Sequence, residues 1–285
     1  RRSSRSSGRG QRGRRSNWQK LFPPIRNAWD DLGKISPEIA NKTGLNPGCE
    51  IVCGVHDSNA SLALYLKHLG RDFVLASTGT WAILFNPSLS LDALNPSRDM
   101  LANIDITGRP IPTARFMGGR EFEALAGDAI DVEAMPCHVK ELLAQGTMAL
   151  PTFAPGNGPF AERQGKIIGP EPKSQQQRAA LASLYLALIT NEVLDLLRAS
   201  DQKIIIDGSY ASNQLYCKLI AALREKQLVY SNNSRDGTAV GASILRKWCD
   251  GESKTDLILN RIERVAIDNL NEYSQNWYSS AHRFA

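Results

Sequence analysis

The sequence predicts an α/β fold, because short apolar runs alternate with helical segments and end in polar turns. Two stretches carry this prediction, residues 51–85 and residues 203–224, and each begins with a run rich in Val or Ile. Such runs are typical of strands that are covered on both faces. Open α/β sheets gather their reactive groups at the carboxyl ends of such strands, so we expect the functional residues there.

Composition limits the function classes. The chain has 285 residues, and its apolar content of 42% is ordinary for a packed core. The net charge of +5 comes from residues 1–16, an Arg/Ser/Gly-rich tail with seven arginines and no acidic residue. We expect this tail to be disordered. Because the remaining residues are slightly acidic, nucleic acid is expected to bind, if at all, through the tail.

Cysteine usage and hydropathy indicate the compartment. No apolar run approaches the roughly 20 residues of a membrane helix, and no secretory segment follows the N-terminus. The five cysteines are irregularly spaced, which predicts reduced thiols and a cytoplasmic protein. Cys49 and Cys53 could share a metal with His56, but we expect them to be core thiols.

Residues 17–50 form a separate, turn-rich segment. Ser36 followed by Pro37 predicts the start of a helix, with Ser36 as the N-cap. The turn-forming run at 43–48 then leads into an expected buried strand at Ile51–Val55. Asp57 follows that strand directly, which suits either a reactive carboxylate or a helix N-cap.

A hairpin follows this strand. Strands are expected at Phe73–Ala76 and Trp81–Phe85, with only Ser77, Thr78, Gly79 and Thr80 between them. Backbone N–H groups and hydroxyls in such a turn can cradle phosphate oxygens, although an ordinary hairpin turn has the same appearance. The combination of an acidic residue after one strand and a hydroxyl-rich turn after the next is more informative than either alone.

The second half repeats the pattern of strand, turn and helix. Gly118 and Gly119 are expected to open a helix. Further helices are expected at 137–150, 175–199, 213–224, 236–243 and 257–278, and strands at 204–206 and 228–230. In the helix at 175–199, the periodicity predicts a buried stripe at Leu181, Leu184, Leu188, Val193 and Leu197.

Two of these motifs resemble a known family. GVHDSNASL followed by STGTW is similar to the start of the second domain of the FGGY carbohydrate kinases, and residues 17–50 resemble the end of their first domain. The resemblance implies a ribonuclease-H-like domain of the actin/hexokinase/Hsp70 ATPase type. It divides the chain into a tail at 1–16, a remnant of the sugar-binding domain at 17–50 and a nucleotide-binding domain at 51–285.

The resemblance also implies roles for particular residues. Asp57 corresponds to the general base that accepts a proton from a sugar hydroxyl. The residues implied in nucleotide binding are Thr78, Gly79 and Thr80 at the phosphates, and Gly119, Glu123, Gly208, Ser209 and Asn213 at the nucleoside. The implied cofactors are ATP and Mg²⁺, whose protein ligands stay unassigned.

The resulting expectation is ATP-dependent phosphorylation of a sugar hydroxyl. One alternative is a nucleotide-binding fragment or pseudokinase without sugar kinase activity, and another is RNA binding through the Arg-rich tail. The expected partner is a small-molecule sugar, with no membrane partner. A homodimer stays open.

Overall fold

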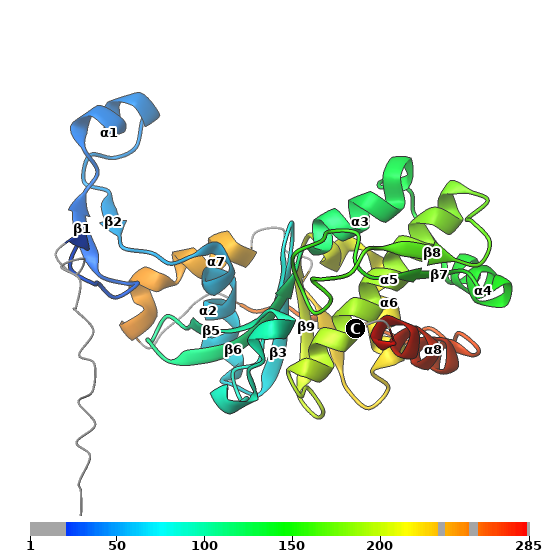
Figure 1. Cartoon of the computed structure of the whole chain (residues 1–285). Helices are drawn as coiled ribbons and strands as arrows, with labels where there is room; N and C mark the ends of the chain where they lie inside the picture. The colour runs from blue at the N-terminus through cyan, green and yellow to red at the C-terminus, as the bar shows by residue number, and fades with distance from the viewer. Residues whose placement is uncertain (1–20, 233–236, 251–255, 284–285) are drawn as a thin grey trace, which may run out of the picture.

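The computed structural model describes residues 21–232, 237–250 and 256–283. The Arg-rich tail and Asp236 lie outside these ranges. The described chain confirms the α/β prediction, with one mixed sheet between two layers of helices and a small lobe set apart from them (Figure 1).

The central sheet has seven strands. Their order is β11 (Asn260–Arg261), β10 (Val229–Ser231), β9 (Lys203–Gly208), β3 (Phe73–Thr78), β4 (Ala82–Phe85), β6 (Pro110–Phe116) and β5 (Met100–Ile104). β3, β9 and β10 are parallel, and the other neighbours pair antiparallel. The two predicted strands of the hairpin are therefore confirmed as β3 and β4.

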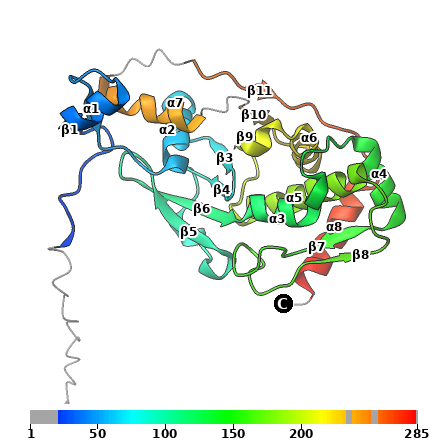
Figure 2. The same ribbon diagram turned by 90° about the horizontal axis from the view of Figure 1, so that it is seen from above.

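Helices cover both faces of the sheet (Figures 1 and 2). One face carries α2 (Asp57–Leu69) and α7 (Gly237–Ser243), followed by the 3₁₀ segment Leu245–Asp250. The other carries α3 (Gly118–Ala126), α5 (Gln175–Leu196) and α6 (Gln214–Leu223). Beyond these lie α4 (Pro136–Gln145), α8 (Leu270–His282) and the hairpin of β7 (Met148–Leu150) and β8 (Lys166–Ile168). Short 3₁₀ turns lie at Leu91–Ala93, Pro96–Arg98, Gly127–Ala129 and Ser209–Ser212.

Helix α5 is the centre of the larger core. All five leucine and valine positions predicted for its buried stripe are at most 2% exposed. By length and composition alone α5 could span a membrane, but 83% of its apolar window is buried inside the domain. Its hydropathy is therefore that of a core helix.

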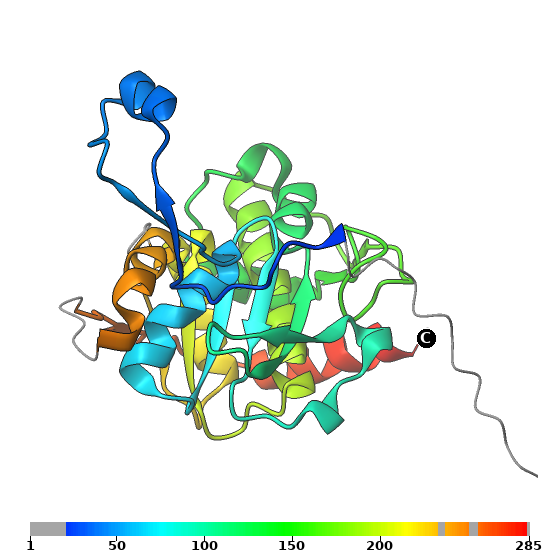
Figure 3. The same ribbon diagram turned by 90° about the vertical axis from the view of Figure 1, so that its left-hand side faces the viewer.

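The expected buried strand at Ile51–Val55 is wrong. Residues Glu50–Val52 form β2, which pairs with β1 (Asp31–Lys34) in a two-stranded sheet of its own, and Ile51 is 40% exposed. The two strands and α1 (Pro37–Thr43) form the small lobe, which stands away from the sheet (Figure 3). A short apolar run does not specify its partner strand, and here a nearby segment of the chain supplies it. The expected N-cap at Ser36 is confirmed.

Two predicted helices and one prediction about cysteines also need correction. Residues 137–150 contain a helix and then strand β7, since Gly146 ends α4 in the left-handed conformation. The last helix begins at Leu270 rather than at 257. Cys53 is exposed and Cys49 is only half-buried, because β2 is not a core strand. All five cysteines are free, and burial raises the pKa of the Cys217 thiol to about 12.

Candidate functional site

The carboxyl ends of β3 and β9 meet at one edge of the sheet. In this parallel pair Ser77 lies opposite Asp207, and Thr78 lies opposite Gly208. The polar turns that follow the two strands are therefore neighbours, although they are far apart in sequence. This is the location where open α/β sheets bind ligands.

A pocket of about 310 Å³ opens at this edge. Its lining comes from the start of α2, the turn between β3 and β4, the end of β9 and the start of α7. The lining residues are His56, Asp57, Ser58, Ser61, Ser77, Thr78, Gly79, Thr80, Trp81, Ile83, Asp207, Gly208, Gly237 and Thr238. The turn and Asp57, which the sequence singled out separately, thus share one cavity. A larger groove of about 480 Å³ lies between α4 and α8, away from these motifs.

Asp57 is the first residue of α2, and His56 occupies the N-cap position. The alternative reading of Asp57 as the N-cap is therefore wrong. Its side chain is 70% exposed, and Oδ1 lies 2.6 Å from His56 Nδ1 and accepts the Ser58 N–H at 2.6 Å. An exposed carboxylate at a helix N-terminus stays available to a ligand that enters the pocket.

The turn at Thr78–Thr80 is held from behind. The Gly119 N–H donates to the carbonyl of Thr80 at 3.1 Å, and a Cβ at Gly119 would lie 2.9 Å from Thr80 Cα. At Gly208 a Cβ would lie 1.9 Å from the Thr78 carbonyl oxygen, and φ is +88°. Only glycine fits there, because any side chain would push the two strand ends apart.

Asp207 is a buried carboxylate at the floor of the pocket, 3% exposed. Its Oδ2 accepts a hydrogen bond from Ser61 Oγ at 2.6 Å, and its Oδ1 accepts one from the Gly208 N–H at 2.8 Å. Its backbone carbonyl accepts one from Thr78 Oγ1 at 2.6 Å. Asp207 therefore contacts α2, β3 and its own turn at once.

Tyr65 lies on the inner side of this carboxylate. Burial raises the pKa of the Tyr65 phenol well above its usual range, and the negative charge of Asp207 raises it further. Asn232 Nδ2 donates to the Tyr65 hydroxyl at 2.9 Å. The phenol therefore stays protonated and neutral beside Asp207.

Of the nine residues predicted for the site, the structure places five in the pocket: Asp57, Thr78, Gly79, Thr80 and Gly208. Gly119 supports the turn from behind. Ser209 and Glu123 are exposed, and the charge of Glu123 adds to burial in raising the pKa of Tyr210, the residue after Ser209.

Asn213 lies outside the pocket lining. Its Oδ1 accepts the Tyr216 N–H at 3.0 Å as the N-cap of α6, and its Nδ2 donates to Ser183 Oγ at 3.0 Å. In this structure its side chain is engaged in helix capping.

Several lining residues were not predicted. Ser61 lies four residues after Asp57 in α2, and that spacing puts both on one helix face. Asp207 stands beside the predicted Gly208, so its position at a strand end was a usable signal. Trp81, Gly237 and Thr238 carried no comparable signal, because their place in the pocket depends on how distant segments pack.

The chemistry of the pocket suits a phosphorylated ligand. It combines backbone amides, several hydroxyls and a close glycine contact with an accessible carboxylate at its rim. Such turns bind phosphate oxygens, and a carboxylate within reach of a hydroxyl can accept its proton.

Sequence comparison places the chain in a family. The family described as "Carbohydrate kinase FGGY, C-terminal domain" matches residues 70–255. L-fuculokinase from Haemophilus influenzae is 41% identical over 63 residues, which are 22% of this chain and 13% of that protein.

Solved structures of kinases have a fold similar to that of this chain. A carbohydrate kinase from Novosphingobium aromaticivorans is 34% identical with a TM-score of 0.75, over 93% of this chain and 58% of that one. Xylulose kinase from Rhodospirillum rubrum (18% identity, TM-score 0.62, 92% of this chain and 58% of that one) shares the fold. Plasmodium falciparum glycerol kinase, solved with ADP, also shares the fold (13% identity, TM-score 0.64, 92% of this chain and 56% of that one).

These similarities confirm the predicted ribonuclease-H-like fold of the actin/hexokinase/Hsp70 type. The chain spans less than two thirds of the length of the solved kinases that it matches. The chain belongs to the FGGY carbohydrate kinases and contains their C-terminal domain.

Proposed function

We propose that this chain supplies the nucleotide-binding half of an ATP-dependent sugar kinase. One observation carries the proposal: a single pocket gathers Asp57, the hydroxyl-rich turn at Thr78–Thr80 and the glycine contact at Gly208. Phosphoryl transfer depends mostly on positioning and on electrostatic stabilisation, and these groups provide both. The glycerol kinase of similar fold was solved with ADP.

In this proposal the turn at Thr78–Thr80 holds the β- and γ-phosphates, with the Thr80 hydroxyl as a donor. Thr78 Oγ1 and the Gly79 N–H shape the turn instead, because they donate to the carbonyls of Asp207 and Trp81. Gly208 and Ser209 lie beside the nucleoside, and Gly119 and Glu123 on α3 approach it from the other side. Asn213 joins them only if its amide contacts the base in addition to capping α6. Residues 51–285 then form the nucleotide-binding domain and residues 17–50 belong to the sugar-binding one.

Asp57 is the general base of this proposal. Its carboxylate is exposed at the pocket rim, where it can accept the proton of a sugar hydroxyl as that oxygen attacks the γ-phosphorus. The role requires reach to the substrate more than a shifted pKa.

The residues also fit a magnesium ion that arrives with the nucleotide. Mg²⁺ usually takes one or two carboxylates and completes its shell with phosphate oxygens and water. The pocket lining has two carboxylates, and Asp57 is the exposed one, because both side-chain oxygens of Asp207 already accept hydrogen bonds from Ser61 and Gly208. Within the described residues no group of three or more acidic, His or Cys side chains could hold a metal. A bound Mg²⁺ would neutralise charge on the transferring phosphoryl group.

The test of the nucleotide site is calorimetry of the 285-residue chain with Mg²⁺ and either ADP or a non-hydrolysable ATP analogue. We expect saturable binding of both. Absence of binding to the folded chain would show that the nucleotide assignment is wrong.

The test of the base is the Asp57→Asn variant in a protein that joins this chain to a complete first domain of the family. Turnover should fall by orders of magnitude while ADP affinity stays within about twofold. The matched control is Asp72→Asn, an exposed carboxylate just beyond the far end of the same helix, which should keep normal turnover. Near-normal turnover of Asp57→Asn would show that Asp57 is not the general base.

A second candidate function is favoured by the share of the related kinases' length that this chain spans. In it, the chain alone binds nucleotide but turns over little sugar. It spans 58% of the Novosphingobium kinase, and its small lobe exposes large apolar side chains that a further domain could cover. The exposed large apolar residues between positions 21 and 52 are Leu21, Phe22, Ile25, Leu32, Ile39, Leu45 and Ile51. A single lobe has no opposing wall to hold a sugar or to exclude water.

An ADP-release assay of the chain across a panel of ketoses and aldoses tests this second candidate. We expect little sugar-dependent release, together with self-association through the exposed apolar lobe. Sugar-stimulated turnover on the order of 1–100 per second would show that the chain is a complete kinase.

A further inference from the structure

We infer that Asp207 is a positioning residue for this reaction: it fixes helix α2, and with it Asp57, relative to the phosphate turn at Thr78–Thr80. The inference rests on the proposed function. It assigns a role to a carboxylate that does not itself need to contact substrate.

The link to α2 is a hydrogen bond between two distant segments. Ser61 Oγ donates to Asp207 Oδ2 at 2.6 Å, and both side chains are at most 3% exposed. Ser61 lies one helical turn after Asp57, so the same face of α2 carries the proposed base and the link. A bond to a buried carboxylate is stronger than one between neutral groups.

The link to the turn runs through the backbone of the same residue. Thr78 Oγ1 donates to the Asp207 carbonyl at 2.6 Å and accepts the Tyr210 N–H at 3.0 Å. The Gly208 N–H is fixed on Asp207 Oδ1 at 2.8 Å. Asp207 thus connects the wall of the pocket that carries Asp57 to the wall that carries Thr78.

Close packing leaves α2 little freedom once this link is made. A Cβ at Gly237, the first residue of α7, would lie 2.7 Å from Asp207 Oδ2. A Cβ at Gly241 would lie 1.8 Å from the carbonyl oxygen of Ala60, so α7 is pressed against α2 directly beside Ser61. If the link were lost, the space left beside α7 and α2 would allow the start of α2 to shift.

The variants Asp207→Ala and Ser61→Ala remove the link, whereas Asp207→Asn can keep it. In Asp207→Asn the amide oxygen can still accept the Gly208 N–H, and the amide N–H can donate to Ser61 Oγ. Glu192→Ala is the matched control, because Glu192 is an equally buried, hydrogen-bonded carboxylate on α5, a helix on the other face of the sheet from α2.

The first measurement is hydrogen–deuterium exchange of the unliganded 285-residue chain, which does not depend on the proposed function. Asp207→Ala and Ser61→Ala should speed exchange at residues 58–65 at least tenfold. Asp207→Asn should change it less than threefold, and Glu192→Ala should leave these amides unchanged.

The second measurement is calorimetry with ADP and with adenosine. Asp207→Ala and Ser61→Ala should lower the affinity for ADP at least tenfold and the affinity for adenosine less than twofold. Asp207→Asn should keep most of the ADP affinity. Equal loss of both ligands, or normal exchange in α2, would overturn the inference. If the wild type binds neither ligand, the proposed function fails, and the exchange data decide on Asp207 alone. If Asp207→Ala does not fold, Ser61→Ala decides.

Discussion

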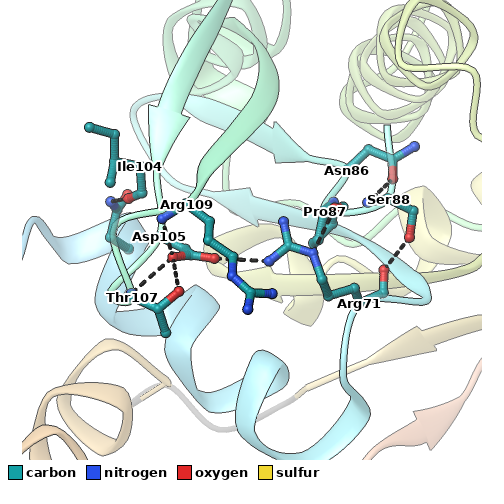
Figure 4. A network of polar contacts seen from close by, with 9 residues as sticks. Arg71, Asn86, Pro87, Ser88, Ile104, Asp105, Thr107 and Arg109 are labelled. Carbon is teal, nitrogen blue, oxygen red and sulfur yellow. Dashed lines mark hydrogen bonds and ion pairs between the residues drawn. The ribbon is translucent and has the colours of Figure 1, made fainter. Parts of the chain in front are cut away.

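A buried carboxylate lies near each end of β3, and the two carboxylates have opposite surroundings. At the carboxyl end, Asp207 lines an open pocket. At the amino end, Asp105 is enclosed by the turn that follows β5 and by Arg71, which lies in the connection between α2 and β3 (Figure 4).

Asp105 has a complete set of donors from its own neighbourhood. Its Oδ1 accepts the Thr107 N–H, the Thr107 hydroxyl and the Arg109 N–H at 2.7–3.0 Å, and its Oδ2 accepts Arg71 Nη1 at 2.9 Å. Arg71 is held in turn by the carbonyl of Pro87. This network joins two connecting segments, so its role is stability.

The comparison teaches that burial and hydrogen bonding do not by themselves mark a functional carboxylate. Both residues are less than 5% exposed and both are well bonded. They differ in what lies beside them: Asp207 faces hydroxyls and glycines at converging strand ends, while Asp105 faces an arginine that neutralises it. The carboxyl edge can therefore accept a ligand where the amino edge is closed.

The largest effect is expected from Gly208→Ala at the carboxyl edge. The added Cβ would overlap the Thr78 carbonyl oxygen, so the unfolding free energy should fall by at least about 3 kcal/mol. Gly127→Ala is the control, because Gly127 also has a positive φ (+52°) but no atom within 4 Å of its Cβ position. Urea denaturation of both variants separates overlap from backbone strain, and equal losses would contradict the expected strand contact.

A smaller effect is expected at the amino edge, from Asp105→Asn. Burial raises the pKa of Asp105, but the hydrogen bonds from Thr107, Arg109 and Arg71 outweigh it, so the pKa lies below its usual value. A depressed pKa in the folded state stabilises the protein above the unfolded-state pKa and ceases to do so as the pH falls through the folded-state pKa.

At pH 7 the Asp105→Asn variant should lose about 1.5–3 kcal/mol of unfolding free energy, as is usual for a hydrogen bond to a charged group. Denaturation between pH 7 and pH 2 should show a smaller loss of stability in acid for the variant than for the wild type. If the unfolding free energies of the variant and the wild type fell in parallel with pH, another carboxylate would be responsible for the loss of stability in acid.

The smallest effect on stability is expected from Ser209→Leu, beside Gly208. Ser209 is exposed, so the unfolding free energy should change by no more than about 0.5 kcal/mol. A leucine there should clash with bound nucleotide and weaken ADP about tenfold, which is about 1.4 kcal/mol. Calorimetry measures the ADP affinity, and Ser212→Leu at the other end of the same 3₁₀ turn is the control. Unchanged ADP affinity of Ser209→Leu would show that the nucleoside does not lie beside Ser209.

The sequence predicted what depends on local pattern. The hairpin at 73–85, the stripe along α5 and the turn after β9 follow from periodicity and turn chemistry, and all are present. Residues 51–55 were misassigned, because an apolar run does not specify whether its partner is a core strand or β1. The hydrogen bond between Ser61 and Asp207 could not be read from the sequence, since it exists only once α2 and β9 are packed.

The pairing of β3 with β9 has a consequence for how the protein folds. Thr78 and Asp207, which hydrogen-bond to each other, are 129 positions apart, so the sheet has a high contact order and its closure is expected to be slow. During synthesis, Asp57 and the turn leave the ribosome long before Lys203, and the side of the pocket that β9 and α7 supply is then still missing. A ligand that contacts both strand ends can therefore stabilise only a chain in which β3 and β9 are paired, and its binding reports that pairing.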